Sequence, residues 1–295
     1  MTLTYTKLAA KPTSKLNNGP AKHAVTAMAA WNLQRLSAGR FTLGLGTQVK
    51  GHIERRFGFH WSAPGPWMRE YILAIRAVWE SWQNRTPLDF NGEHYRLNLI
   101  VPLFDPGPID HPHIPIHVAA VNEYMCQVAG EVADGVRPHP VCSAAYIKDV
   151  MLPSLHRGAA LAGRDESQLS VSIKPLIATA PDEQGLEEKV RDVRARISFY
   201  ASTPAYRAAF DHHGLGDLAD ELRVLSKAQR WEEMPRFIDD DILHQYAVVG
   251  LYDDIAAKLK SRYGGLVTHA EFSIPIKQST DEERLREMLA SLREA

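Results

Sequence analysis

The sequence has little cysteine, no excess of charge and no long apolar run. Its two cysteines, Cys126 and Cys142, exclude the disulfide framework of small secreted domains and fit a reducing compartment. The 34 lysines and arginines balance 35 aspartates and glutamates, so no broad basic surface is offered to nucleic acid or an anionic membrane. No apolar stretch reaches the ~20 residues of a membrane-spanning helix, and residues 1–20 lack the apolar core of a signal peptide. We therefore expect a cytoplasmic protein that binds neither nucleic acid nor a membrane.

Two common kinds of catalytic centre also lack support in the sequence. Histidines cluster at residues 111–117 and 212–213, but no acidic residue or cysteine completes either set at the spacing of metal ligands. No serine lies in a Gly-x-Ser-x-Gly elbow, so a hydrolase triad of that type has no support either. We expect no bound metal.

The composition is that of an ordinary folded protein. Of the 295 residues, 45% are hydrophobic and 23% are charged, enough apolar sequence for one large α/β domain or two smaller ones. Residues 1–22 are rich in lysine, asparagine and proline, and we expect them to be irregular apart from a possible short strand at residues 3–8. Residues 23–295 form the expected ordered domain.

One stretch, residues 36–48, combines a helix end, a tight turn and a short strand that stops in glycines. Ala38-Gly39 suits a helix C-cap, because glycine adopts the left-handed backbone of that position without strain. The apolar run at residues 41–45 is typical of a buried parallel strand, and its end has no side chain at Gly44 or Gly46. Ligands of α/β proteins bind at the carboxyl ends of strands. The alternative is a helix–strand turn with two packing glycines.

The rest of the chain alternates between predicted strands and helices, which favours βαβ units and a parallel sheet. Asn91-Gly92 predicts a small antiparallel hairpin within residues 87–103. A closed (β/α)8 barrel needs eight strands, and we find five principal ones. The predicted strands are residues 41–45, 114–120, a short one at Val136, 169–180 and 266–276. The predicted helices are residues 25–36, 66–83, 124–132, 146–161 with a break at Pro153, 182–200, several short pieces in 218–248, one from Asp253 to Gly264, and 281–294.

Several of these stretches together resemble the luciferase-like oxidoreductase superfamily, which includes flavin-dependent monooxygenases and enzymes that use the deazaflavin coenzyme F420. The resemblance runs from about residue 24 to the end of the chain, and residues 46–57 more narrowly resemble the F420-dependent branch. The matching sequences are Leu-Ser-Ala-Gly-Arg-Phe-Thr-Leu-Gly-Leu-Gly at 36–46, Met-Arg-Glu at 68–70 with Trp79, Phe-Asn-Gly-Glu-His-Tyr at 90–95, Pro-Ile-His-Val-Ala-Ala at 115–120 and Ala-Gly-Glu-Val-Ala-Asp-Gly at 129–135.

The resemblance implies a luciferase-like (β/α)8 TIM barrel over residues 23–295, with a small insertion near residues 84–112. Members of the superfamily begin with three strands and two helices that have no counterpart before residue 25, so the barrel is expected to be N-terminally incomplete. Open strand edges favour pairing with another chain, and we therefore expect a homodimer.

Carried over by position, the resemblance implies a cofactor site at the carboxyl ends of the strands. Its predicted cofactor-binding residues are Gly46, Thr47, Gln48, Ala119, Ala120, Val121, Asn122 and His139. The turn at residues 119–122 matches one whose N–H groups hold the cofactor phosphate in relatives, and a helix N-terminus suits an anion. His52 is the predicted catalytic residue, because imidazole titrates near neutral pH and can donate a proton. Each histidine has a simpler alternative, as a surface or loop residue.

The resemblance thus predicts an oxidoreductase that transfers a hydride between coenzyme F420 and a small organic substrate. One alternative is an FMN-dependent luciferase-like monooxygenase. A second is a non-catalytic, incomplete-barrel remnant that binds a flavin. No residue in the sequence identifies the substrate.

Overall fold

A computed structural model of the chain describes residues 22–58 and 60–293. These residues divide into two compact units. Unit 1 comprises the described residues up to Arg137 together with Ser154–Leu169, and unit 2 comprises Pro138–Pro153 and the described residues from Ser170 onward. Within the described ranges, no helix combines the length and apolar character that crossing a membrane requires.

Unit 1 is built on three neighbouring strands, β1 (Leu43–Leu45), β4 (Ile116–Ala120) and β5 (Gly135–Pro138), in that order. β1 and β4 run parallel, with Gly44 opposite His117 and Leu45 opposite Val118. The accompanying elements are α1 (Lys22–Leu36), the π-helical turn η1 (His52–Arg56), α2 (Pro64–Asn84), the hairpin strands β2 (Phe90–Asn91) and β3 (Arg96–Leu97), the 3₁₀ turn η2 (Pro102–Phe104), α3 (Glu123–Val132), α5 (Leu152–Leu161) and η4 (Glu166–Gln168).

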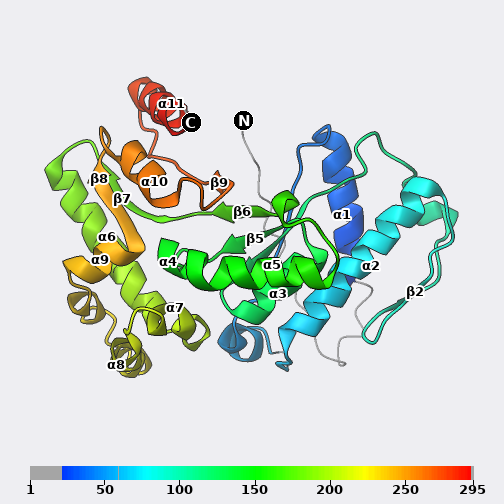
Figure 1. Cartoon of the computed structure of the whole chain (residues 1–295), viewed down its shortest axis with the longest axis horizontal. Coiled ribbons are helices and arrows are strands. Elements are labelled where there is room, and N and C mark those ends of the chain that lie inside the picture. The colour runs from blue at the N-terminus through cyan, green and yellow to red at the C-terminus, as the bar shows by residue number, and fades with distance from the viewer. Residues whose placement is uncertain (1–21, 59, 294–295) are drawn as a thin grey trace. The chain divides into compact units, whose positions relative to one another are not determined.

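The junction between α1 and β1 forms as its sequence predicts. Ala38 and Gly39 both have positive φ, 50° and 85°, so the chain leaves the helix through left-handed backbone and enters the strand. α1 and α2 lie side by side (Figure 1) and are joined by a buried hydrogen bond from the Trp79 indole N–H to the Ala27 carbonyl at 3.0 Å. The rings of Trp31 and Trp79 stack between these helices. The aromatic face of α2 is therefore core.

The predicted hairpin is present, but α2 fixes its turn. β2 and β3 pair antiparallel across residues 92–95, a longer loop than the two-residue turn that Asn91-Gly92 suggests. The Glu70 carboxylate on α2 accepts the backbone N–H groups of Glu93 at 3.0 Å and His94 at 2.7 Å, and also that of Tyr95. A carboxylate from another element therefore satisfies donors that the turn itself leaves unpaired.

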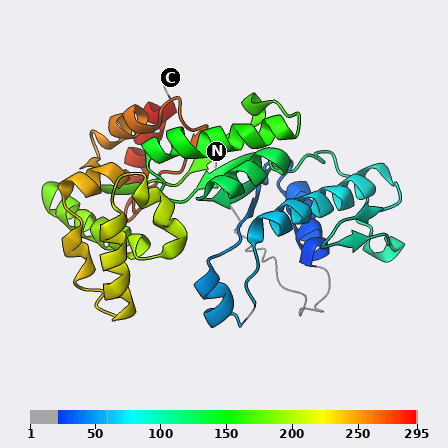
Figure 2. The ribbon, with the colours of Figure 1, turned by 60° about the horizontal axis from the view of Figure 1, so that its bottom comes forward.

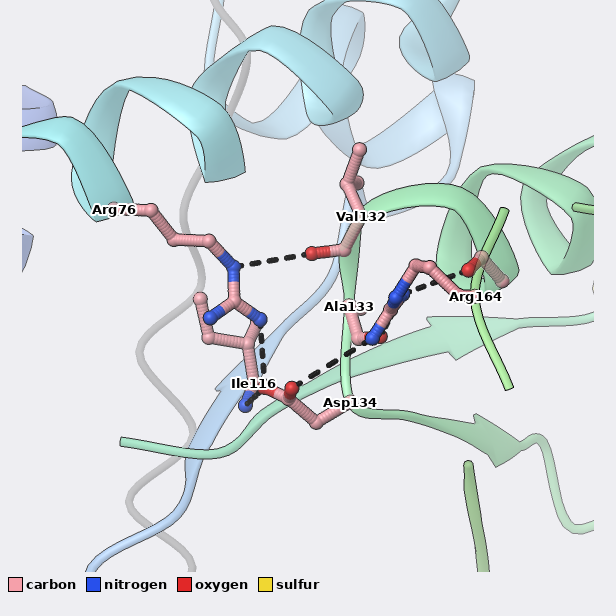
Figure 3. Close-up of polar contacts among 7 residues, drawn as sticks. Arg76, Ile116, Val132, Ala133, Asp134 and Arg164 are labelled. Atoms are coloured by element: carbon pink, nitrogen blue, oxygen red, sulfur yellow. Dashed lines mark hydrogen bonds and ion pairs between the residues drawn. The ribbon is translucent and has the colours of Figure 1, made fainter. Parts of the chain in front are cut away.

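Asp134, in the turn between α3 and β5, is a hub of polar contacts (Figure 3). Its carboxylate accepts the backbone N–H of Ile116 at 2.7 Å and the Arg76 guanidinium at 2.7 Å. Arg164 lies 3.8 Å from the other carboxylate oxygen and donates to the carbonyls of Gly130 and Ala133. One carboxylate thus ties the beginning of β4 to α2 and to the segment after α5.

Unit 2 holds two strand pairs and most of the later helices. β6 (Ser170–Ile173) pairs parallel with β9 (His269–Ala270), and β7 (Leu176–Ala180) pairs parallel with β8 (Ala247–Leu251). Its helical elements are α4 (Ala144–Tyr146), η3 (Ile147–Met151), α6 (Glu183–Ala201), η5 (Pro204–Tyr206), α7 (Arg207–Asp211), α8 (Gly216–Lys227), η6 (Met234–Phe237), α9 (Asp240–Tyr246), α10 (Ile255–Tyr263) and α11 (Ser279–Arg293).

Four predictions in this half of the chain are wrong. The single strand at residues 169–180 is two strands, because Pro175 has no N–H to continue a ladder. Residues 247–251, assigned in part to helix, form β8, and the strand at 266–276 is reduced to β9. The N-cap of α10 is Asp254 rather than Asp253, whose carboxylate instead pairs with Arg284.

The fold is of the predicted class, mixed α/β with parallel strands flanked by helices, and it is barrel-like. A strand lies in each of the five predicted stretches. In the described part of the chain β1 pairs with β4 alone, and no strand closes the sheet on its other side. The single barrel domain, its insertion and the absence of three leading strands stay predictions, and the strand at residues 3–8 lies outside the described residues.

Candidate active site

β1 and β4 present a face of small residues at their carboxyl ends. The other face of both strands is buried, through Leu43, Leu45, Ile116, Val118 and Ala120. The alternate positions are Gly44, Gly46, Ala119 and the buried His117, which lies opposite Gly44. We call Gly44, Gly46 and Ala119 the small-residue floor. Ala119 is exposed, although it lies in a strand with a neighbour on each side. An exposed apolar residue in a paired strand marks a surface that a ligand can reach.

The floor is both open and flat. A Cβ built on Gly44 meets no described atom within 4 Å, so this position faces open space. A Cβ built on Gly46 would lie 3.3 Å from the Cβ of Ala119, which is a tight contact. The two strands therefore approach closely at Gly46, and larger side chains there would fill the surface. The part of the face formed by Gly46 and Ala119 carries no side chain larger than a methyl group, so a planar ring fits there, whereas His117, opposite Gly44, is a buried side chain on the same face.

The chain leaves β1 through a strained turn. Gln48 adopts left-handed backbone, with φ of 63°, which non-glycine residues adopt uncommonly and at a cost. The Thr47 hydroxyl donates to the Gln48 carbonyl at 3.3 Å. Strained backbone of this kind clusters at functional sites, so this turn supports the prediction that Thr47 and Gln48 belong to one.

His52 opens the π-helical turn η1, which projects from the loop after β1 (Figure 2). The His52 carbonyl accepts the Phe57 N–H at 3.0 Å, closing the wide turn. Ile53 anchors the turn in the core, whereas the His52 side chain is exposed. Single π turns occur frequently at functional sites. The fold thus fixes the backbone of His52 and leaves its ring accessible.

The basic residues around His52 differ in how far they are neutralised. Lys50 lies 3.8 Å from Glu54, and an exposed ion pair of this kind contributes little to stability. The Arg56 guanidinium lies over the Phe57 ring, 5.5 Å from its centroid, and Arg55 is exposed. This loop carries positive charge toward solvent.

The β4–α3 turn holds the other four predicted residues of unit 1, Ala119 to Asn122. Asn122 is the N-cap of α3, and its side chain makes no capping hydrogen bond. Its carbonyl accepts the N–H groups of Met125 and Cys126, so those of Glu123 and Tyr124 lie at the exposed end of the helix. N–H groups at this position favour an anion. The carboxylate of Glu123 in the same first turn opposes one.

His139, which directly follows β5, belongs to unit 2. Its ring stacks on Tyr206, with centroids 4.1 Å apart and planes 23° apart, and meets Tyr200 edge-on at 4.7 Å. The Val141 N–H approaches its Nδ1 at 3.4 Å, a weak hydrogen bond at best. Two tyrosine rings therefore pack against His139.

A second histidine fixes the same loop. His213 Nε2 lies 2.7 Å from the Ser143 hydroxyl, and its Nδ1 lies 2.5 Å from the Gln245 amide. Ser143 is buried and caps α4 by accepting the Tyr146 N–H at 3.0 Å. Ser143 is thus a structural cap, and the pair is not a nucleophile with its base.

Burial lowers the pKa of His213, and the neighbouring His212 lowers it further, while Asp149 opposes this effect. Since the folded pKa lies below the unfolded value of about 6.5, the stability of the neutral ring is present above that pH. It is lost as the pH falls through the folded pKa. We expect the free energy of unfolding, measured in urea, to fall between pH 7.5 and pH 5, and His213→Gln to reduce this dependence. His60→Gln, at an exposed histidine, should leave it unchanged; equal slopes for all three proteins would contradict the assignment.

The structure thus brings Gly46 and Ala119 together. Thr47, Gln48 and His52 follow Gly46 along the chain, and Ala120, Val121 and Asn122 follow Ala119. It places His139 in the other unit. The roles of these nine residues stay predictions. Sequence reasoning missed the rings of Tyr200 and Tyr206, because contacts between distant segments leave no local pattern, and His213, which was considered only as a metal ligand.

Comparison with known proteins identifies relatives along nearly the whole chain. A model of the luciferase-like monooxygenase family matches residues 17–269. The uncharacterized protein Rv1360 of Mycobacterium tuberculosis is 41% identical over 293 residues, covering 97% of this chain and 85% of its own. A 5,10-methylenetetrahydromethanopterin reductase of Archaeoglobus fulgidus is 26% identical over 262 residues, covering 86% of this chain and 73% of its own.

Solved structures share the fold at lower identity. The coenzyme F420-dependent tetrahydromethanopterin reductase of Methanopyrus kandleri superposes with a TM-score of 0.71 at 18% identity, covering 92% of this chain and 78% of its own. The oxygenating constituent of 3,6-diketocamphane monooxygenase of Pseudomonas putida, in complex with FMN, superposes with a TM-score of 0.57 at 16% identity, covering 91% of this chain and 74% of its own.

Proposed function

Because the chain belongs to the luciferase-like monooxygenase family, we propose that it is an oxidoreductase that transfers a hydride between coenzyme F420 and a small organic substrate. The observation that carries the proposal is the small-residue floor, where Gly46 and Ala119 meet without large side chains at the carboxyl ends of two parallel strands. Ligands bind at this end of strands in α/β proteins. A relative that is 27% identical, the putative coenzyme F420-dependent oxidoreductase Rv3520c of Mycobacterium tuberculosis, and the F420-dependent fold neighbour favour a deazaflavin over other flat cofactors.

The residues present fit such a group. Gly44, Gly46 and Ala119 offer van der Waals contact to one face of a ring without obstructing it. The first-turn N–H groups of α3, after Asn122, suit a phosphate on the cofactor tail. The basic loop near His52 adds long-range attraction for an anionic tail. When bound, F420 supplies a carbon centre that donates or accepts a hydride.

The protein's own contribution is binding, orientation and proton transfer. His52 holds or releases the proton that balances the hydride at the substrate, because an imidazole can act as a general acid or a general base. Its exposed ring and the backbone that η1 holds in place suit that task. Thr47 and Gln48 shape the edge of the floor.

FMN is the second candidate cofactor. The 3,6-diketocamphane monooxygenase component, which shares the fold, was solved in complex with FMN, and this supports FMN as the alternative. With FMN the proposed reaction would be a monooxygenation, so the choice of cofactor decides the reaction class. The small-molecule substrate and the homodimer are likewise proposals, and size-exclusion chromatography with light scattering tests the second.

A larger side chain on the small-residue floor tests whether the cofactor binds there. Ala119→Leu places three more carbon atoms on an exposed position, so folding is retained while the approach of a ring is blocked. We expect the Kd for F420, measured by fluorescence titration, to rise at least about tenfold. Ala160→Leu makes the same change at an exposed alanine on α5 and should leave the Kd unchanged. Equal affinities in both variants would overturn the placement of the cofactor.

A further inference from the structure

An open cavity of about 350 Å³ lies within unit 2, beside α9, β8 and α10. Figure 1 shows these three elements next to one another. The cavity is lined by His244 of α9, by residues 247–249 of β8, and by Lys258, Ser261 and Arg262 of α10. Its volume lies within the range of about 300–1,000 Å³ that is typical of ligand pockets. A small organic molecule therefore fits in it.

The strand side of this cavity is a free edge of β8. β8 pairs with β7 along one edge, and in the described part of the chain no strand pairs with the other. Lys258 donates to the Val249 carbonyl at 2.9 Å and Arg262 donates to the Ala247 carbonyl at 2.7 Å, so the backbone groups of these alternate residues point away from β7. Because the N–H and C=O of one strand residue point the same way, the Val249 N–H is a further donor on this edge.

The helix side of the cavity carries an arginine that is held in place and keeps its charge. Lys258, Ser261 and Arg262 share one face of α10, because residues three and four positions apart are neighbours on a helix. The Arg262 guanidinium donates to the carbonyls of His244 and Ala247. Carbonyl groups are neutral, and none of the carboxylates in the described ranges pairs with Arg262. Its full positive charge therefore stays beside the cavity.

The polar groups at the cavity suit a ligand that accepts hydrogen bonds and carries negative charge. Asp254 lies 2.6 Å from Lys258 and balances that one charge, which leaves the charge of Arg262 uncompensated. The Ser261 hydroxyl is exposed and has no hydrogen-bond partner among the described residues. None of the described residues that line the cavity is acidic. The guanidinium, the ammonium, the hydroxyl and the Val249 N–H outnumber the two oxygens of a carboxylate, and the three terminal oxygens of a phosphate group match them better.

We propose that this cavity is a binding site for a phosphate group that a small organic molecule carries. The cavity lies beside residues 247–249, the amino-terminal part of β8, whereas the substrates and cofactors of α/β enzymes bind at the carboxyl ends of strands. The site is thus additional to the proposed active site and does not depend on the proposed function. A phosphate ester and inorganic phosphate share the same chemistry, and the size of the cavity favours the ester.

Calorimetric titration of the full chain with glycerol 3-phosphate, inorganic phosphate and glycerol, at one ionic strength so that screening is equal, tests the site. We expect saturable binding of glycerol 3-phosphate, binding of inorganic phosphate that is about three- to tenfold weaker, and no binding of glycerol. Equal affinity for the two phosphates would identify the inorganic ion as the ligand and overturn the ester. Binding of neither phosphate would overturn the site.

Two variants test whether the phosphate binds at this cavity. Ser261→Asp places a negative charge there and should weaken glycerol 3-phosphate binding at least about tenfold. Lys258→Gln removes a positive donor and should weaken it about threefold or more. Ser291→Asp on α11 and Lys227→Gln on α8 make the same changes at exposed positions and should leave the Kd unchanged. Arg262 is not substituted, because it also holds the backbone of α9 and β8.

Circular dichroism establishes that each variant is folded. Unchanged affinity in both Ser261→Asp and Lys258→Gln would overturn the inference. F420 titration of Ser261→Asp separates this site from the proposed cofactor site. Normal F420 binding with loss of glycerol 3-phosphate binding supports an additional site, whereas an equal loss of both would assign the cavity to the cofactor's phosphate and contradict the inference.

Discussion

His52→Ala is expected to lower kcat/KM for F420-linked turnover about a hundredfold or more, with the Kd for F420 changed less than about threefold. A positioned general acid or base contributes roughly 10²–10⁴-fold to a rate. The substitution removes an exposed ring from η1, while Ile53, which anchors the turn, and the Phe57–His52 backbone hydrogen bond remain. We therefore expect the variant to fold and to bind F420 normally, and the decrease in kcat/KM to come from a slower chemical step.

Two comparisons separate this role from a general effect of the loop. His60→Ala, at an exposed histidine just beyond the turn, should retain full turnover. The pH–rate profile of the wild type should show an ionisation that the profile of His52→Ala lacks. Full activity in His52→Ala, or an unaltered profile, would mean that this histidine is a surface residue.

Asp134→Ala is expected to cost about 3 kcal/mol of unfolding free energy, because it breaks a largely buried ion pair by removing one partner. The carboxylate is 18% exposed and accepts the Ile116 N–H and the Arg76 guanidinium (Figure 3). Removing the carboxylate leaves Arg76 and Arg164 as two positive charges without a shared counter-ion. Burial already lowers the pKa of Arg164, and the charge of Arg76 lowers it further. Urea unfolding followed by far-UV circular dichroism measures the loss.

Asp211→Ala is the matched control, since Asp211 also pairs with an arginine, Arg207, but lies exposed on α7. Exposed pairs contribute about 0–1 kcal/mol, so this variant should lose less than about 1 kcal/mol. Similar losses in the two variants would show that Asp134 is not a hub. Because β4 leads to the small-residue floor, we also expect Asp134→Ala to weaken F420 binding before it unfolds the chain.

Local signals in the sequence predicted the parts of the fold that local interactions determine. Ala38-Gly39 marked the end of α1 because a left-handed C-cap depends on the residues at the cap itself. The apolar runs of β1 and β4 were found because both strands are covered on one face by core residues. The small residues at their ends were found in the same way.

The errors arose where tertiary contacts decide the structure. Residues 169–180 have one continuous apolar pattern, and only the missing N–H of Pro175 divides them into β6 and β7. β8 was assigned to helix in part, because a short apolar run after α9 has no period of its own. Its pairing with β7 lies far away in the sequence.

In the candidate site, too, local sequence signals predicted some residues, and tertiary contacts determine the others. Gly46 and His52 were singled out from the sequence because they follow a glycine-ended strand. The strained backbone of Gln48 and the π turn at His52 have no signature in residue type. The rings that hold His139 come from residues about 60 positions away, and only the folded chain shows them. Sequence therefore located the floor, and the structure supplied its surroundings.

The central proposal, hydride transfer with coenzyme F420, is tested most directly by titrating the purified full chain with F420 and with FMN in parallel, followed by fluorescence and absorption. We predict saturable binding of F420 that Ala119→Leu weakens and that excess FMN does not displace. Tight binding of FMN with no affinity for F420 would contradict the proposal and favour a monooxygenase, and binding of neither would point to a non-catalytic remnant of the family.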